Sequence, residues 1–215
     1  MKLATVLTRA HFGLEAPLVR VEVYCGSGLP QLTMVGLAEA AVRESRDRVR
    51  AALAVSGFEF PAGRVTVNLA PADLPKEGGR FDLAVALGIL AASGQLPARS
   101  LEATEFYGEL SLSGDLRAVR GTLVAAAKAA REGHRLVVPR ACLAEARAAG
   151  SAPVAAAGSL EAVCSALAGG PPLVFDRGGP LPAVDAAAAD LADVRGQAGA
   201  RRALEVAAVG RHGRR

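Results

Sequence analysis

Cysteine, long apolar runs and a secretory leader are scarce or missing in this sequence of 215 residues. The three cysteines, Cys25, Cys142 and Cys164, are far apart and odd in number, which argues against a disulfide scaffold and against cysteine pairs with metal-ligand spacing. No run of about 18 apolar residues is free of charge, so no membrane span is expected. The first residues contain no apolar signal-peptide segment, and these absences together predict a reducing, cytoplasmic location.

Tryptophan is also absent, and lysine occurs only at positions 2, 76 and 128, with arginine in its place elsewhere. This bias is typical of genome composition, so the excess of arginine by itself indicates no binding site. The histidines, His11, His134 and His212, are scattered, with neither an HExxH motif nor a carboxylate at ligand spacing. We therefore predict no metal site in this chain.

The formal net charge of +4 is unevenly distributed along the chain. Residues 190–215 contain six arginines and three acids, a net +3, whereas the first 189 residues carry about +1. The main body is therefore close to neutral, and its composition alone does not indicate nucleic-acid binding. Any contact with DNA is expected chiefly in the basic tail, for which the candidate residues are Arg195, Arg201 and Arg202.

Hydrophobic periodicity predicts strands and helices that interleave along the chain. The predicted strands are 3–8, 18–24, 31–35, 64–70 and 135–138, with a hairpin formed by 105–112 and 115–119. The predicted helices are 38–55, 81–92, 122–131, 140–149 and 159–167, of which 81–92 is apolar almost all round and is expected in the core. This pattern favours a layered α+β or α/β domain over residues 1–168.

Residues 169–189, GGPPLVFDRGGPLPAVDAAAA, are rich in Gly, Pro and Ala and predict a linker. Residues 190–215 follow with one amphipathic helix, whose stripe includes Ala200, Leu204 and Ala208. One short helix cannot bury its own apolar face, so this segment is expected to be the start of a further module.

Four stretches of the sequence, in order, resemble the ComM/YifB family of Mg-chelatase-related AAA+ proteins. The most specific is VTVNLAPADLPKEGGRFDLAVALGIL, at 65–90. The others are RAHFGLEAPLVRVEVYCGSGLPQLTMVGL, FYGELSLSGDLRAVRG and DLADVRGQAGARRALEVAAVGRHG. The resemblance covers nearly the whole chain.

The resemblance implies a two-part protein. Residues 1–168 would have the fold of the Lon proteolytic domain, an α+β fold of the ribosomal S5 domain 2 type, and 190–215 would be the truncated start of an AAA+ ATPase module. ComM-type members form hexameric rings and drive ATP-dependent branch migration of DNA. The implied function is a non-catalytic assembly or DNA-engaging domain with no membrane role. Its partners would be further copies of itself and DNA. A fragment of an Mg-chelatase-like ATPase subunit and a Lon-like peptidase are the alternatives.

No Walker A motif, G-x-x-x-x-G-K-[ST], occurs in the sequence. We therefore expect no enzyme activity and no bound ATP or Mg²⁺ from this chain; those cofactors would belong to the rest of an AAA+ module. Both simple truncation and a shifted reading frame would account for the missing motif, and the choice between them stays open.

The peptidase alternative depends on a Ser–Lys dyad. In the resemblance to Lon, the serine position falls on Arg80 and the lysine position near Leu123, while Lys128 is about five residues too late. Since a nucleophile needs a neighbouring base, we expect no peptidase activity.

The glycine loop that precedes the buried helix is the candidate interaction site of the main domain. Its residues are Lys76, Glu77, Gly78, Gly79, Arg80 and Asp82. One hypothesis has Lys76 and Arg80 facing a partner or DNA. The other is a tight turn that begins the helix, with Asp82 capping the helix and Arg80 paired with a carboxylate.

Overall fold

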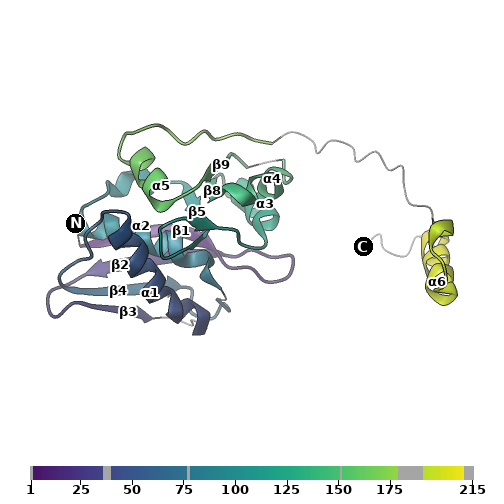
Figure 1. Cartoon of the computed structure of the whole chain (residues 1–215), viewed down its shortest axis with the longest axis horizontal. Coiled ribbons are helices and arrows are strands. Elements are labelled where there is room, and N and C mark those ends of the chain that lie inside the picture. The colour runs from purple at the N-terminus through teal and green to yellow at the C-terminus, as the bar shows by residue number, and fades with distance from the viewer. Residues whose placement is uncertain (1, 36–39, 77, 151, 179–190, 211–215) are drawn as a thin grey trace. The chain divides into compact units, whose positions relative to one another are not determined.

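The structure, a computed structural model, describes residues 2–35, 40–76, 78–150, 152–178 and 191–210 (Figure 1). It divides into two compact units, Met1–Pro180 and Leu181–Arg215. The strands of the first unit are β1 (Leu3–Arg9), β2 (Leu18–Cys25), β3 (Gln31–Val35), β4 (Arg64–Ala70), β5 (Thr104–Phe106), β6 (Glu109–Leu110), β7 (Leu116–Arg117), β8 (Arg135–Pro139) and β9 (Val154–Ala157). Its α-helices are α1 (Ala40–Val55), α2 (Asp82–Ser93), α3 (Thr122–Arg131), α4 (Leu143–Arg147) and α5 (Leu160–Leu167). Short 3-10 turns are η1 (Gly79–Phe81), η2 (Ala98–Leu101) and η3 (Arg140–Cys142).

Seven strands form the main sheet in the order β3-β4-β2-β1-β5-β8-β9. The β1–β2 and β2–β4 pairs are antiparallel, and the remaining neighbours are parallel. Val19, Val21 and Val23 of β2 are all buried, as the alternation in the sequence predicts. The small β6–β7 pair forms a separate two-stranded sheet. The expected α+β class is confirmed.

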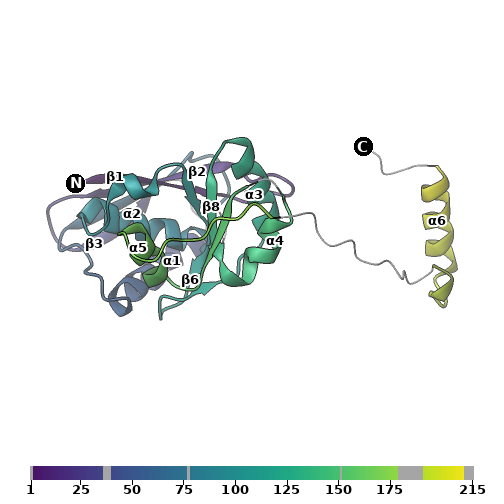
Figure 2. The same cartoon turned by 90° about the horizontal axis from the view of Figure 1, so that it is seen from above.

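Helix α2 forms the centre of the larger core because it packs against β1 and β2 while α1 covers its other side (Figures 1 and 2). Every residue from Asp82 to Ala92 is buried, which confirms that the apolar segment is a core helix. A Cβ at Gly88 would lie 2.5 Å from a Val23 methyl carbon. Glycine is therefore needed where this helix crosses β2.

A second core forms between β8 and the helices α3 and α4. Leu136 and Val138 of β8 belong to this second core, whereas Val137 between them belongs to the core around α2. Alternate side chains of a strand point to opposite faces. The parallel part of the sheet is therefore covered on both faces.

The segment 105–112, predicted as one strand of a hairpin, is instead two strands. β5 pairs with β8 in the main sheet, and the backbone N–H of Tyr107 still donates to Val137 (3.0 Å) before the chain turns at Gly108. β6 then pairs with β7. The predicted helix 140–149 is also shorter, because it begins as η3 and α4 ends at Arg147.

The first unit extends beyond the boundary expected at residue 168. Leu173 and Phe175 pack against the larger core, and Asp176 exchanges two backbone hydrogen bonds with Val154 (2.8 and 3.0 Å). Glycine and proline predict a linker here, but two apolar side chains attach the segment to the domain. Most of the remaining expected linker, 179–189, lies outside the described residues.

The second unit contains η4 (Leu191–Asp193) and α6 (Ala198–Val209). No residue of α6 is buried, and Leu204 and Val206 are 58% and 51% exposed. The proposed identity of this unit as the start of an AAA+ module stays a prediction. Across the described parts of both units, no helix combines the length and the apolar character that crossing a bilayer requires.

Candidate interaction site around the glycine loop

The glycine loop joins β4 to α2 and packs closely against β6. Gly79 is buried, and a Cβ at this position would lie 2.5 Å from Cγ of Glu109. Only glycine allows this approach without displacing the Glu109 side chain. Glu77, also expected in the site, lies outside the described residues.

Lys76 does not face outward, contrary to the first hypothesis. Its side chain is fully buried, and Nζ donates to the carbonyl oxygens of Pro71 (2.6 Å) and Leu74 (3.1 Å). Burial lowers the pKa of Lys76, although the charge of Asp73 opposes that effect. The ammonium group therefore closes the loop after β4, and Lys76 is removed from the candidate contact residues.

Arg80 is partly exposed and lies against Tyr107. Its Nη1 donates to the Tyr107 hydroxyl (2.5 Å) and, at 3.4 Å, to the carbonyl of Arg120, while the guanidinium lies 5.7 Å from the centre of the Tyr107 ring. The hydroxyl in turn donates to the same carbonyl at 3.1 Å. The Tyr107 hydroxyl and the Arg120 carbonyl thus bind the guanidinium, because the Tyr107 hydroxyl needs polar partners in the core, and the expected pairing of Arg80 with a carboxylate stays a prediction.

A depression of about 180 Å³ lies beside this arginine. Its lining comprises Gly78, Gly79, Arg80, Glu109, Ala118, Val119 and Arg120. Arg117 lies near it, with Nη1 3.9 Å from a Glu109 carboxylate oxygen and a side chain that is 62% exposed. We name Arg80, Arg117 and Arg120 the basic rim. Three arginines and one glutamate gather at this surface, and this excess of positive charge favours an anionic group there.

Asp82 forms an ion pair instead of capping α2. It accepts hydrogen bonds from Arg48 of α1, with Nε to Oδ2 at 2.9 Å and Nη2 to Oδ1 at 3.4 Å, and from the backbone N–H of Leu110 at 3.3 Å. Its side chain is fully buried, and no side-chain cap bond forms at this helix start. Asp82 is therefore a structural link between α1, α2 and β6.

Burial raises the pKa of Asp82 to about 6, with Arg48 opposing the shift. Because the folded state binds this proton more tightly than the unfolded chain, the contribution to stability is complete below the ordinary pKa of 3.8 and is lost as pH rises through 6. We expect the native protein to lose up to roughly 3 kcal/mol across this window relative to Asp82→Asn. Urea unfolding of both proteins between pH 4 and 7 measures the difference, and parallel stability curves would contradict the assignment.

The two positions at which the resemblance to Lon would place the dyad contain neither a nucleophile nor an amine. Arg80 is engaged with Tyr107, and Leu123 is 40% exposed with its backbone N–H donating to Glu145 (3.2 Å). The nearest lysine along the helix, Lys128, forms an ion pair with Glu15.

A buried charged network connects β1 with β5, and the sequence pattern did not predict it. Arg9 and Glu105 are 1% and 0% exposed and form two hydrogen bonds of 2.6 Å. His134 Nδ1 lies 2.8 Å from the same carboxylate, and Glu132 lies 3.2 Å from the guanidinium. The fold thus gives His134 the carboxylate neighbours that sequence spacing does not show. Glu105, Glu132 and His134 lie within metal-ligand reach of one another, but Arg9 already neutralises Glu105 and would repel a cation.

The tail arginines lie in the second unit. Arg195 is exposed, Arg201 donates to the Val194 carbonyl (3.4 Å), and Arg202 pairs with Glu205 at 3.3 Å. Such exposed pairs contribute little to stability, so these side chains can exchange their partners for phosphates. Their role stays a prediction.

The family model described as subunit ChlI of Mg-chelatase matches residues 21–142. YifB of Salmonella typhimurium is 48% identical, YifB of Escherichia coli 47%, and competence protein ComM of Haemophilus influenzae 44%, each over 99% of this chain. The chain spans 42% of the length of these relatives. It belongs to the Mg-chelatase-related ComM/YifB family of AAA+ proteins.

Proposed function

We propose that this chain is the non-catalytic assembly and DNA-engaging domain of a ComM-like AAA+ branch-migration helicase. In this proposal it forms the N-terminal tier of a ring of identical copies. Its 44% identity over 99% of the chain to a protein named for competence supports the assignment. ATP and Mg²⁺ would bind the AAA+ module, since the 215 residues contain no Walker A motif.

The proposal rests on the residues that occupy the two dyad positions of the Lon-like site. A peptidase needs a hydroxyl or thiol with a base within hydrogen-bond reach. Arg80, at the serine position, is held by Tyr107, and Leu123 offers no amine. The depression beside Arg80 is bordered by the basic rim. Its charge favours binding of an anionic group over cleavage of a peptide bond.

The Mg-chelatase alternative rests on the description of the matching family. Among the described residues, Glu105, Glu132 and His134 are the group with ligand spacing. Arg9 forms two hydrogen bonds to Glu105 there, which does not favour delivery of Mg²⁺. We therefore favour the DNA-engaging role.

DNA binding by the full chain is expected to be weak, salt-dependent and dominated by the tail. The reason is the charge distribution, about +1 before residue 190 and +3 after it. Each phosphate contact contributes about 0.9 to the slope of log affinity against log salt. Replacing Arg195, Arg201 and Arg202 by alanine should therefore reduce the slope by up to about 2.7. Fluorescence anisotropy of a labelled duplex over a salt series provides the measurement.

Two further triple variants make this test specific. Replacing the three arginines of the basic rim by alanine should change the slope of log affinity against log salt less than replacing the three tail arginines. A matched control removes three exposed arginines of the first unit, Arg20, Arg64 and Arg131, and should leave the slope nearly unchanged. If the basic-rim variant changes the slope more than the tail variant, the DNA-binding site lies at the glycine loop instead of the tail. Salt-independent binding, or no binding, would overturn the DNA-engaging role.

A further inference from the structure

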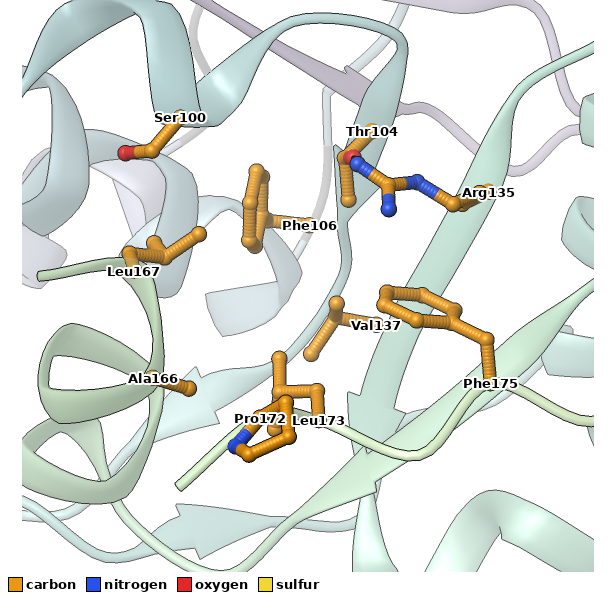
Figure 3. Close-up of a pocket in the computed structure, with 10 residues that line it drawn as sticks. All are labelled: Ser100, Thr104, Phe106, Arg135, Val137, Ala166, Leu167, Pro172, Leu173 and Phe175. Carbon is orange, nitrogen blue, oxygen red and sulfur yellow. The ribbon is translucent and has the colours of Figure 1, made fainter. Parts of the chain in front are cut away.

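A pocket of about 240 Å³ lies between α5, β5, β8 and the segment 172–175, and we name it the α5 pocket. Figure 3 shows Phe106 and Val137 in its wall, with Leu167 of α5 on one side and Phe175 on the other. An engineered apolar cavity of ~150 Å³ binds benzene. The α5 pocket therefore has room for one aromatic ring with a short substituent.

The polar part of the lining comes from Ser100, Thr104 and Arg135. The Ser100 hydroxyl donates to the Pro97 carbonyl at 2.6 Å, and the Thr104 hydroxyl donates to the Glu102 carbonyl at 3.2 Å. Both hydroxyl hydrogens are therefore used within the protein. Among the described residues that line the pocket there is no acidic side chain, so the arginine gives the pocket a net positive charge.

Arg135 directs its guanidinium into the α5 pocket (Figure 3). Nη2 donates to Thr104 Oγ1 at 2.9 Å, and the guanidinium lies 4.8 Å from the centre of the Phe175 ring. Because a guanidinium has five N–H donors in a planar fork, most of them stay available to a ligand. Arg9 and Arg48 each pair with a carboxylate, whereas Arg135 forms no ion pair within the described parts of the chain.

An arginine beside an apolar wall favours a carboxylate that carries an apolar group, because the planar guanidinium can donate two parallel hydrogen bonds to the two carboxylate oxygens. We propose that the α5 pocket binds a small aryl carboxylate, with the ring against Phe106 and Val137 and the carboxylate on Arg135. A neutral aromatic molecule would leave the positive charge without a partner, and a small inorganic anion would leave the apolar wall in water. The site lies apart from the glycine loop and the tail, so it does not depend on the proposed function.

The segment 172–175 forms one wall of the α5 pocket, so a bound ligand contacts this segment and β8 together. Leu173 and Phe175 pack against the larger core, and the Asp176 N–H donates to the Val154 carbonyl at 3.0 Å. Opening of the segment would break this hydrogen bond and the pocket at once. The ligand should therefore slow hydrogen exchange of the Asp176 amide, by about tenfold at a concentration ten times its dissociation constant.

Titration of the isotope-labelled full chain with phenylacetate, followed by two-dimensional NMR, tests the proposal. The amides of Thr104, Val137 and Phe175 should shift, with a dissociation constant below about 1 mM. Phenylacetamide has the same ring without the charge, and acetate has the charge without the ring. Each should bind at least about tenfold more weakly than phenylacetate, because each lacks one of the two contacts.

Two variants locate the ligand within the α5 pocket. Arg135→Gln should weaken phenylacetate binding at least about tenfold and leave the weaker binding of phenylacetamide nearly unchanged. Ala166→Phe fills the pocket from its half-exposed edge on α5 and should abolish binding of both molecules. Arg140→Gln is the matched control, since Arg140 is an exposed arginine directly after β8, and it should not change either affinity.

Equal thermal midpoints establish that the variants are folded, and Arg135→Gln decides the matter if Ala166→Phe is not. Several results would each overturn the site: no saturable shift up to about 10 mM phenylacetate, equal affinity for phenylacetamide, or unchanged binding by Arg135→Gln. Shifts confined to amides outside the α5 pocket would also overturn it, as would saturation without slower exchange at Asp176. The salt dependence of DNA binding tests the proposed function independently of these results.

Discussion

Replacing Arg9 with leucine is expected to lower the free energy of unfolding by about 3–5 kcal/mol. The guanidinium and the Glu105 carboxylate are almost completely shielded from solvent and share two hydrogen bonds of 2.6 Å. Without Arg9, the carboxylate remains buried beside His134 and close to a second carboxylate, that of Glu132. Desolvation of a charge that has lost its partner is costly, so the effect should exceed that of an ordinary surface substitution several-fold. Urea unfolding at pH 7 measures it.

The double variant Arg9→Leu with Glu105→Leu separates the loss of the pair from the loss of packing. Apolar residues of similar volume can replace a buried ion pair at little cost, so the double variant should recover most of the lost stability. Arg20→Leu, an exposed arginine on β2, should change stability by less than about 0.5 kcal/mol. If the double variant is no more stable than Arg9→Leu, the electrostatic explanation is wrong.

Replacing Arg48 with alanine is expected to cost about 1.5–3 kcal/mol at pH 7, the range for hydrogen bonds to a charged group. The cost is smaller than for Arg9 because Asp82 keeps its bond from Leu110 and takes up a proton when its partner is removed. Loss of Arg48 should raise the pKa of Asp82 further, so stability should continue to fall with pH above 6. Unfolding free energies of the native and Arg48→Ala proteins at pH 5, 6, 7 and 8 measure this slope.

Two substitutions control the Arg48 experiment. Arg46→Ala removes an exposed arginine from the same helix and should have a small effect that does not vary with pH. Arg48→Asn with Asp82→Asn removes both charges and should restore a flat pH dependence between 6 and 8. A steep slope in the double variant would locate the titrating group elsewhere.

Local sequence patterns predicted the elements that depend on periodicity. The alternation of Val19, Val21 and Val23 is confirmed as β2, and the segment 81–92 is confirmed as a helix buried throughout. β9 was missed because the sequence VAAA contains three alanines, which indicate a strand only weakly. The end of the domain was also misplaced, because Leu173 and Phe175 occur among glycines and prolines.

The sequence could not show how the candidate site is assembled. One of the two hypotheses for the loop had Lys76 facing a partner, yet its side chain is buried and its ammonium donates to two carbonyl groups of its own loop. Arg120 joins the site from 40 residues beyond Arg80. Asp82 is paired with Arg48, 34 residues away, and the alternative of a local cap is equally compatible with its position in the sequence. Side-chain partners at these separations depend on the completed fold.

The central position of β1 in the sheet has a consequence for the order of events during protein synthesis. β1 has β2 on one side and β5 on the other, and Arg9 and Glu105 are separated by 96 residues. At a synthesis rate of roughly 5–20 residues per second, β5, the second neighbour of β1, is synthesised about 5–20 s after β1. During that interval the nascent chain carries an open strand edge and an unpaired arginine next to it. Ribosome-bound chains that end before residue 105 should therefore be the ones on which chaperones act.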